Sequence, residues 1–418
     1  MNYPIYEAKW NILREKISEA GGNGRETVDA LVAHHEIYTE GLVEWLARLY
    51  DKDIGGFYYS NSGRDNDGFL PDIESTMQAL NIIRLSGMID SPKEIPKEMR
   101  RKIAMFVCSL MDPDDGYIYH PQWGKNISDS RRGRDLMWAI NTSDLLKFRL
   151  PYSPATERLQ AASQGIETED EVEPLEHLKS EKALLSYLES YDWKNNAYYA
   201  GNNLAAQMYQ VSAAGLADVA IDFLDSVQNK ETGLWANNTG YDSVNGAFKI
   251  SFIYDIADKP LKHAEKIAKT AMNCITSFDE ETRTACYIYN TWYTIINVMQ
   301  NIEKYSEDGK ARAAEIRKEC LLGAPEAIRA TTAKVVTRRK PDGSFSMAND
   351  RTSATSQGAP VAKRLPNGDA PNEGDVNATV IAGTSITTHI YRTLGLLDYR
   401  IPLFSKETYK SFLSIIGY

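Results

Sequence analysis

The chain has 418 residues, of which 43% are apolar and 25% charged, a composition that excludes wholesale disorder and predicts a globular protein with a sizeable core. Its net charge of −10 disfavours nucleic-acid binding, which needs clustered Lys and Arg, so we expect a small-molecule or oligosaccharide partner. No apolar run approaches the ~18 residues of a membrane helix, and the first residues lack the pattern of a signal peptide. We therefore expect a cytoplasmic protein without a membrane partner, unless a leader was removed; the sequence does not predict its oligomeric state.

Helical periodicity dominates the chain, and sustained strand alternation is almost absent. The patterns predict helices over 25–50, 72–89, 94–111, 134–148, 174–191, 203–212, 214–229, 243–257, 261–277, 282–305, 307–335, 376–396 and 405–416. Six of these follow polar or glycine-rich loops and are apolar on much of their circumference, which predicts inner helices. They are the helices that begin near residues 72, 134, 203, 243, 282 and 376. The helices between them carry charges on one side and fit an outer ring.

Glycine turns followed by an aromatic residue recur between these helices. The clearest contains Gln228, Gly233 and Trp235, and related turns lie around Gly55, Gly116 and Gly343. The helix starts also repeat, because the sequence DIEST at 72–76 aligns with DVNAT at 375–379. Such internal repetition is typical of a repeat architecture, and it favours one domain over residues 1–418.

The turn with Gln228, Gly233 and Trp235 resembles the glutamine-tryptophan turn of terpenoid cyclases and prenyltransferases, whose fold is a toroid of helical hairpins. Six-hairpin glycosidases and polysaccharide lyases are built on a similar toroid. The resemblance implies an all-α fold, an (α/α)6 toroid with inner and outer helix rings.

Two segments interrupt the helical rhythm. The acidic stretch 165–176 predicts a solvated loop. The stretch 338–375 has no periodicity and many Gly, Pro, Asn and Ser residues, and loops of that length in a compact domain are usually functional. Because it leads into an inner helix, we expect it to form a lid over the mouth of the toroid.

Two short motifs have competing interpretations. Asp112-Pro113-Asp114-Asp115 resembles the DxDD acid of class II terpene cyclases, but the same residues are ordinary turn formers, and we favour the turn. The basic cluster 131–134 can bind a phosphate or carboxylate, and a solvated surface cluster is the simpler interpretation.

The four cysteines lie far apart in helical patterns, which predicts small buried side chains rather than disulfides. The six histidines show no metal-ligand spacing. We expect neither a metal nor another cofactor.

Acidic residues cluster where inner helices are expected to start. Capping of the free helix N–H groups is their simplest role. A toroid, however, gathers these helix starts at one mouth, so the side chains would converge there. The candidate catalytic residues are Asp72, Glu74, Asp242, Glu373 and Asp375. The candidate substrate-binding residues are Tyr241, Asn245, Lys249, Trp235, Arg134 and Asp135.

The loops are rich in Asn, Asp, Tyr and Arg, which suits the recognition of sugar hydroxyls. We therefore expect a carbohydrate-active enzyme that cleaves a glycosidic bond, with one carboxyl as acid and a second carboxylate as base or nucleophile. A polysaccharide lyase, with Tyr241 as base and Lys249 or Asn245 stabilising the anion, is an alternative. A terpenoid cyclase-like or prenyltransferase-like enzyme and a non-catalytic glycan-binding toroid remain open.

Overall fold

A computed structural model of the chain describes residues 6–163 and 174–418, and most of that part is helical, so the predicted all-α class is confirmed. The predicted acidic loop lies mostly outside the described residues, from 165 to 173. The α-helices are α1 (Glu7–Glu19), α2 (Gly24–His35), α3 (Gly41–Arg48), α4 (Asn61–Arg64), α5 (Ile73–Leu85), α6 (Lys97–Ser109), α7 (Asp129–Leu146), α8 (Ala155–Ser163), α9 (Glu181–Glu189), α10 (Trp193–Ala206), α11 (Met208–Ala213), α12 (Ala217–Val227), α13 (Tyr241–Ile256), α14 (Ala264–Thr276), α15 (Ala285–Tyr305), α16 (Gly309–Leu322), α17 (Ala324–Val336), α18 (Val376–Thr379), α19 (Ile386–Thr393) and α20 (Lys406–Ile415). In these ranges, no helix is long and apolar enough to cross a membrane.

The strands are short and form two antiparallel hairpins. The first pairs β1 (Tyr50–Asp51) with β2 (Gly56–Phe57), with Tyr50 opposite Phe57. The second pairs β3 (Thr355–Ser356) with β4 (Ala359–Pro360), with Thr355 opposite Pro360. Both hairpins are loop features, so neither adds a sheet to the helical core.

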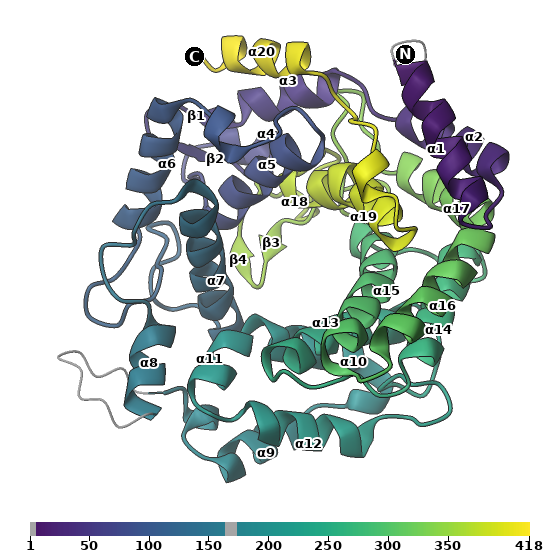
Figure 1. Cartoon of the computed structure of the whole chain (residues 1–418). Helices are drawn as coiled ribbons and strands as arrows, with labels where there is room; N and C mark the ends of the chain where they lie inside the picture. The colour runs from purple at the N-terminus through teal and green to yellow at the C-terminus, as the bar shows by residue number, and fades with distance from the viewer. Residues whose placement is uncertain (1–5, 164–173) are drawn as a thin grey trace.

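Six helical units contact one another in a closed sequence around a common centre (Figure 1). α5 packs against α7, α7 against α10, α10 against α13, and α13 against α15. The last unit consists of α18, the π-helical segment Val380–Ser385 and α19; it contacts α15 on one side and α5 on the other. Helices such as α6, α9 and α12 lie outside this sequence in Figure 1.

Four of the six units start within three residues of their predicted positions, at Ile73, Tyr241, Ala285 and Val376. Two predicted starts were wrong. α7 begins at Asp129 rather than 134, because the Ser128 hydroxyl accepts a hydrogen bond from the backbone N–H of Arg131 and caps the helix there.

α10 begins at Trp193, ten residues before the predicted 203. The Asp192 carboxylate caps it by accepting a bond from the Asn195 N–H, and the helix bends at Asn196, whose φ is −139°. The first part of this helix contains several asparagines, which are typical of loops, so the sequence pattern predicted a loop there. α1 was not predicted at all, although it buries Trp10, Leu13 and Ile17.

The predicted glycine turns share one geometry. In three of them an Asp or Asn side chain accepts bonds from two backbone N–H groups, those two and three residues on, and its own carbonyl accepts from a glycine four residues on. The glycines are Gly55, Gly116 and Gly233, with φ between 70° and 85°, a region that costs other residues strain. Asp112 opens the second turn, as the turn interpretation of its motif predicts. Its carboxylate also pairs with Lys125 at 2.5 Å.

The turn before α13 also contains the predicted glutamine and tryptophan. Gln228 Nε2 donates to the Gly233 carbonyl at 2.8 Å, and Trp235 Nε1 donates to the Leu224 carbonyl at 2.9 Å. Trp235 is buried, so this turn fixes α13 to α12 through a packed indole ring.

The repeated helix starts of α5 and α18 are equivalent in detail. Asp72 accepts from the Ser75 N–H at 2.9 Å, and Asp375 accepts from the Ala378 N–H at 2.6 Å. The following threonine of each repeat accepts a bond from a phenylalanine N–H, Phe57 to Thr76 and Phe345 to Thr379, both at 3.0 Å. Each preceding turn is thereby bonded to the helix that follows it.

The segment 338–375 contains the β3–β4 hairpin and no helix. The Ser356 hydroxyl donates to Glu74 at 2.9 Å, and the Ser130 hydroxyl donates to the side chain of Gln357 at 3.0 Å. Farther along the segment, the Thr352 hydroxyl donates to Asp375 at 2.6 Å. The segment therefore rests on the first turns of α5, α7 and α18.

Candidate functional site

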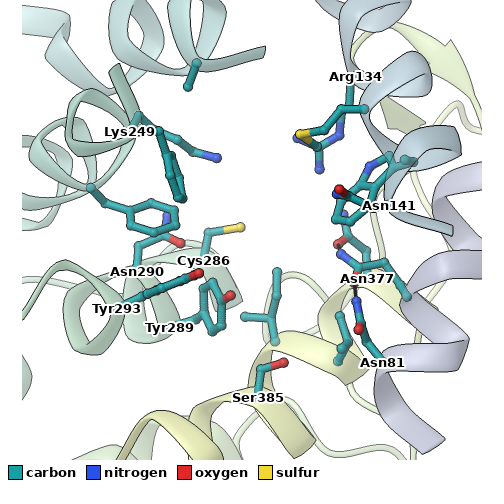
Figure 2. Close-up of a pocket in the computed structure, with 18 of the residues that line it drawn as sticks. Asn81, Arg134, Asn141, Lys249, Cys286, Tyr289, Asn290, Tyr293, Asn377 and Ser385 are labelled. Atoms are coloured by element: carbon teal, nitrogen blue, oxygen red, sulfur yellow. Dashed lines mark hydrogen bonds between the residues drawn. The ribbon is translucent and has the colours of Figure 1, made fainter. Parts of the chain in front are cut away.

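A cavity of about 400 Å³ lies at the centre of the closed helix sequence and is lined from all six units (Figure 2). That volume is within the range of small-molecule sites. Six of its lining residues are amides: Gln78, Asn81, Asn141, Asn202, Asn290 and Asn377. Aromatic rings line it as well: Trp138, Tyr209, Phe248, Phe252, Tyr289 and Tyr293. Amides and rings together suit a ligand that has both hydroxyl groups and apolar faces.

Hydrogen bonds fix the amides of one wall. Arg84 donates to Asn81, Asn81 to Gln78, and Gln78 to Asn377, at 3.1, 3.2 and 3.2 Å. On the opposite wall Asn290 donates to Asn245 at 2.5 Å. The side chains are thus held in place before any ligand enters.

Four cations line the cavity, Arg84, Arg134, Lys249 and Arg392, whereas none of the described lining residues is Asp or Glu. Figure 2 shows that Lys249 and Arg134 point into the cavity from opposite walls. The electrostatic field of the lining therefore favours an anionic ligand.

Lys249 forms no hydrogen bond or ion pair with any described residue, and its ammonium lies 5.2 Å from the centre of the Phe248 ring. Burial, and next the positive charge of Arg134, lower the pKa of Lys249 to about 8. A substantial fraction of this amine is neutral in mildly alkaline solution, so it can accept a proton.

His389 lines the cavity beside two tyrosines. Its ring stacks on Tyr293 with centroids 4.3 Å apart and lies 5.0 Å from Tyr289. Neither ring nitrogen has a hydrogen-bond partner among the described residues. Burial lowers the pKa of His389 to about 3, so the imidazole is neutral near pH 7. Burial likewise raises the pKa of the Tyr289 phenol well above its usual value, so it remains a proton donor.

A buried ion network lies at one end of the cavity, at the first turns of α5 and α7. We call this end the mouth end. Arg131 lies 3.1 Å from Glu74 and 2.6 Å from Asp135, and Arg134 also pairs with Glu74. Burial alone would raise the pKa of Glu74, but the charges of the two arginines outweigh it and hold the pKa at about 2. For Asp135 burial wins over Arg131, and the pKa is raised to about 6.

The other predicted catalytic residues are distributed around the same end. Asp72 and Asp375 are buried helix caps, and burial raises the pKa of both, that of Asp375 to about 6. Glu373 accepts a bond from the Ser62 N–H at 3.0 Å. Asp242 is not a cap, because α13 is preceded by Gly240; its side chain is 39% exposed, pairs with Arg283 and accepts a bond from the Tyr287 hydroxyl at 2.5 Å.

Of the predicted substrate-binding residues, Arg134 and Lys249 line the cavity. Tyr241 is buried and donates to the Cys274 carbonyl at 2.6 Å. Asn245 donates to the Tyr241 carbonyl at 2.8 Å and reaches the cavity through Asn290. Trp235 and Asp135 are buried away from the lining.

The sequence interpretation missed most of the lining: the amides, Arg84, Arg392, His389 and Cys286. One signal could have found them, because Asn81, Arg84 and Asn290 are polar residues within otherwise apolar inner helices. A polar side chain at such a position must face either a partner or a cavity.

Comparisons with protein-family models, with curated proteins and with solved structures gave no match to this chain.

Proposed function

We propose that the chain is a single-domain toroid of six helical hairpins and a carbohydrate-active enzyme that cleaves a glycosidic bond in an acidic oligosaccharide by β-elimination. The carrying observation is the central cavity, whose described lining combines an unpaired Lys249, amides and tyrosines with no carboxylate. The closed contacts of the six inner units and their repeated turns support the toroid. Amides that recognise hydroxyls support a sugar as the ligand.

Elimination needs three groups in the cavity. A cation must neutralise the sugar carboxylate, a base must remove the proton from the carbon beside it, and an acid must protonate the leaving oxygen. We assign the first role to Arg134, assisted by Asn290 and Asn377, the second to neutral Lys249, and the third to Tyr289. The C–H electron pair forms a carbon–carbon double bond as the neighbouring C–O bond breaks, and the leaving oxygen takes the phenol proton.

Hydrolysis by a carboxylate pair is the second candidate. It is favoured by the accessibility of Asp242, which keeps an exposed carboxylate at the start of an inner helix. Glu74 serves it poorly as an acid, because the two arginines hold its pKa near 2. A terpenoid cyclase fits least well, since a hydrocarbon leaves the amides and Lys249 without partners.

The test is incubation with uronate oligosaccharides while ultraviolet absorbance and reducing ends are both recorded. Elimination produces both signals, because its double bond is conjugated to the carboxylate, whereas hydrolysis produces reducing ends alone. We expect Lys249→Met to lower the rate roughly a hundredfold or more with little change in the melting temperature. Lys269→Met, at an exposed position on α14, is the matched control.

The pH profile separates two roles for Lys249. As a base it must be neutral, so the rate should rise as pH increases through about 8. A rate that falls over the same range would make it a cation that holds the carboxylate.

Two results would refute the elimination mechanism: full activity in Lys249→Met, or no double-bond product from any uronate. Reducing ends without a double-bond product would favour the hydrolase. Binding without turnover would favour a glycan-binding protein.

A further inference from the structure

A second group of cations lies at the far end of the cavity, which we define as the end at the last turns of α5 and α19. Arg84 lies in the last turn of α5 and Arg392 in the last turn of α19, and both line the cavity. Arg84 is ten residues after Glu74 on α5, which is about 15 Å along the helix axis at 1.5 Å per residue. The two ends are therefore too far apart for one carboxylate to bridge.

The far end has no counter-ion among the described residues. Arg84, Arg392 and the nearby Arg400 form no ion pair with any Asp or Glu in the described ranges. Burial, and then the like charge of Arg392, lower the pKa of Arg84. The Nε atom of Arg84 is buried and has no hydrogen-bond partner in the described part of the chain. Like charges that gather away from water without an anion cost free energy.

Helix capping explains only part of this group. A cation near a helix C-terminus interacts favourably with the helix dipole. Arg400 does this, donating to the Leu85 carbonyl at 2.5 Å and to the Thr388 hydroxyl at 2.7 Å. Arg84, in contrast, donates only to Asn81, and Arg392 forms no hydrogen bond with a described residue. The Nη1 group of Arg84 and the guanidinium of Arg392 therefore have no described partner and are available to a ligand.

We propose that Arg84 and Arg392 form a second oxyanion subsite, which binds a carboxylate, sulfate or phosphate group on the same oligosaccharide that is cleaved nearer the mouth. Guanidinium groups bind such oxyanions in a planar, two-pronged geometry. Ser385 adds a neutral hydroxyl group to the same lining. The identity of the ligand rests on the proposed function, and it narrows the substrate to an oligosaccharide with repeated negative charges.

The test is calorimetric titration with sodium sulfate, galacturonate and tetragalacturonate. We expect Arg84→Gln and Arg392→Gln each to weaken tetramer binding about tenfold, the effect of losing one charged hydrogen bond, and to leave monomer binding unchanged. Arg392→Lys keeps the charge but loses the two-pronged geometry, so its affinity should be intermediate. Arg101→Gln, at an exposed position on α6, is the control for net charge. Thermal melts verify that each variant is folded.

The outcomes separate this subsite from the proposed reaction. Tetramer binding that depends on both arginines, without a double-bond product from any uronate, keeps the subsite and removes the elimination mechanism. Sulfate binding that is lost in both variants while tetramer binding is unchanged would show an independent anion site and overturn the proposal. Unchanged tetramer binding in both variants also overturns the proposal. So does a wild-type chain that binds none of the three probes.

Discussion

Cationic side chains have different surroundings at the two ends of the cavity. At the mouth end Arg131 is buried and pairs with Glu74 and Asp135, while Arg134 pairs with Glu74 and also lines the cavity. At the far end Arg84 and Arg392 line the cavity and form no ion pair with a described residue. A cation such as Arg131, which is fully paired and buried, stabilises the fold, whereas a cation in the cavity lining that forms no ion pair is available to a ligand.

The largest expected effect is the removal of Arg131, whose side chain is 0% exposed. Arg131→Met leaves Glu74 and Asp135 without their shared cation, and breaking a buried pair in this way costs about 3–5 kcal/mol. Urea melts measure the loss. Arg101→Met, which breaks an exposed pair with Glu98, should cost under about 1 kcal/mol. Equal losses in the two variants would show that the mouth network does not stabilise the fold.

Asp375 is a mouth-end carboxyl that forms no ion pair with any described residue. Burial raises its pKa from 3.8 to about 6 in the folded protein. The folded state therefore binds this proton more tightly than the unfolded state, and the associated stability is present below pH 4 and lost as pH rises through about 6.

We expect the free energy of unfolding of the wild type, relative to Asp375→Asn, to fall by up to about 3 kcal/mol between pH 4 and 7, since each pKa unit is worth about 1.4 kcal/mol. Urea melts at a series of pH values test this. The amide that Asp375→Asn introduces can still cap α18 through its oxygen, so the helix start should survive. A constant difference between the two proteins at all pH values would contradict the shifted pKa.

The smallest expected effect concerns the far end. Removing one of several like charges relieves repulsion, so Arg392→Gln should leave stability unchanged or raise it by about 0.5 kcal/mol at low ionic strength. The gain should vanish in 1 M salt, where the screening length is about 3 Å. Melts in both conditions measure it. A loss of stability at low salt would mean that Arg392 has a structural partner.

The repeated elements were the predictable part of this fold. Gly55, Gly116 and Gly233 mark turns by local chemistry alone, and an aspartate before an apolar helix predicts a cap, so Asp72 and Asp375 were found as helix starts. α10 was misplaced because its start depends on the single Asp192 cap and not on apolar periodicity. The pattern of glycine and aspartate fixes where a helix begins, but it does not fix which side of the helix faces the centre.

The site was less predictable for that reason. Lys249 and Arg134 were identified as candidates and do line the cavity, but the amides, His389 and Arg392 were not. When an inner helix is apolar on all sides, its sequence has no hydrophobic asymmetry, so the side that faces the centre cannot be predicted. Arg84 and Arg392 lie at the same end of the cavity because α5 packs against the π-helical segment and α18, which lead into α19. This contact joins residues some 300 positions apart, and no local pattern encodes it.

That last contact also has a consequence for biosynthesis. The side of α5 that packs against the π-helical segment and α18 has no partner until residues 376–385 have left the ribosome. Part of the buried surface of α5 therefore has no packing partner while some three hundred further residues are translated. Contacts of such sequence separation form slowly, and exposed apolar surface promotes aggregation in the interval. Chains truncated before residue 376 should be held by chaperones or degraded rather than accumulate as a folded fragment.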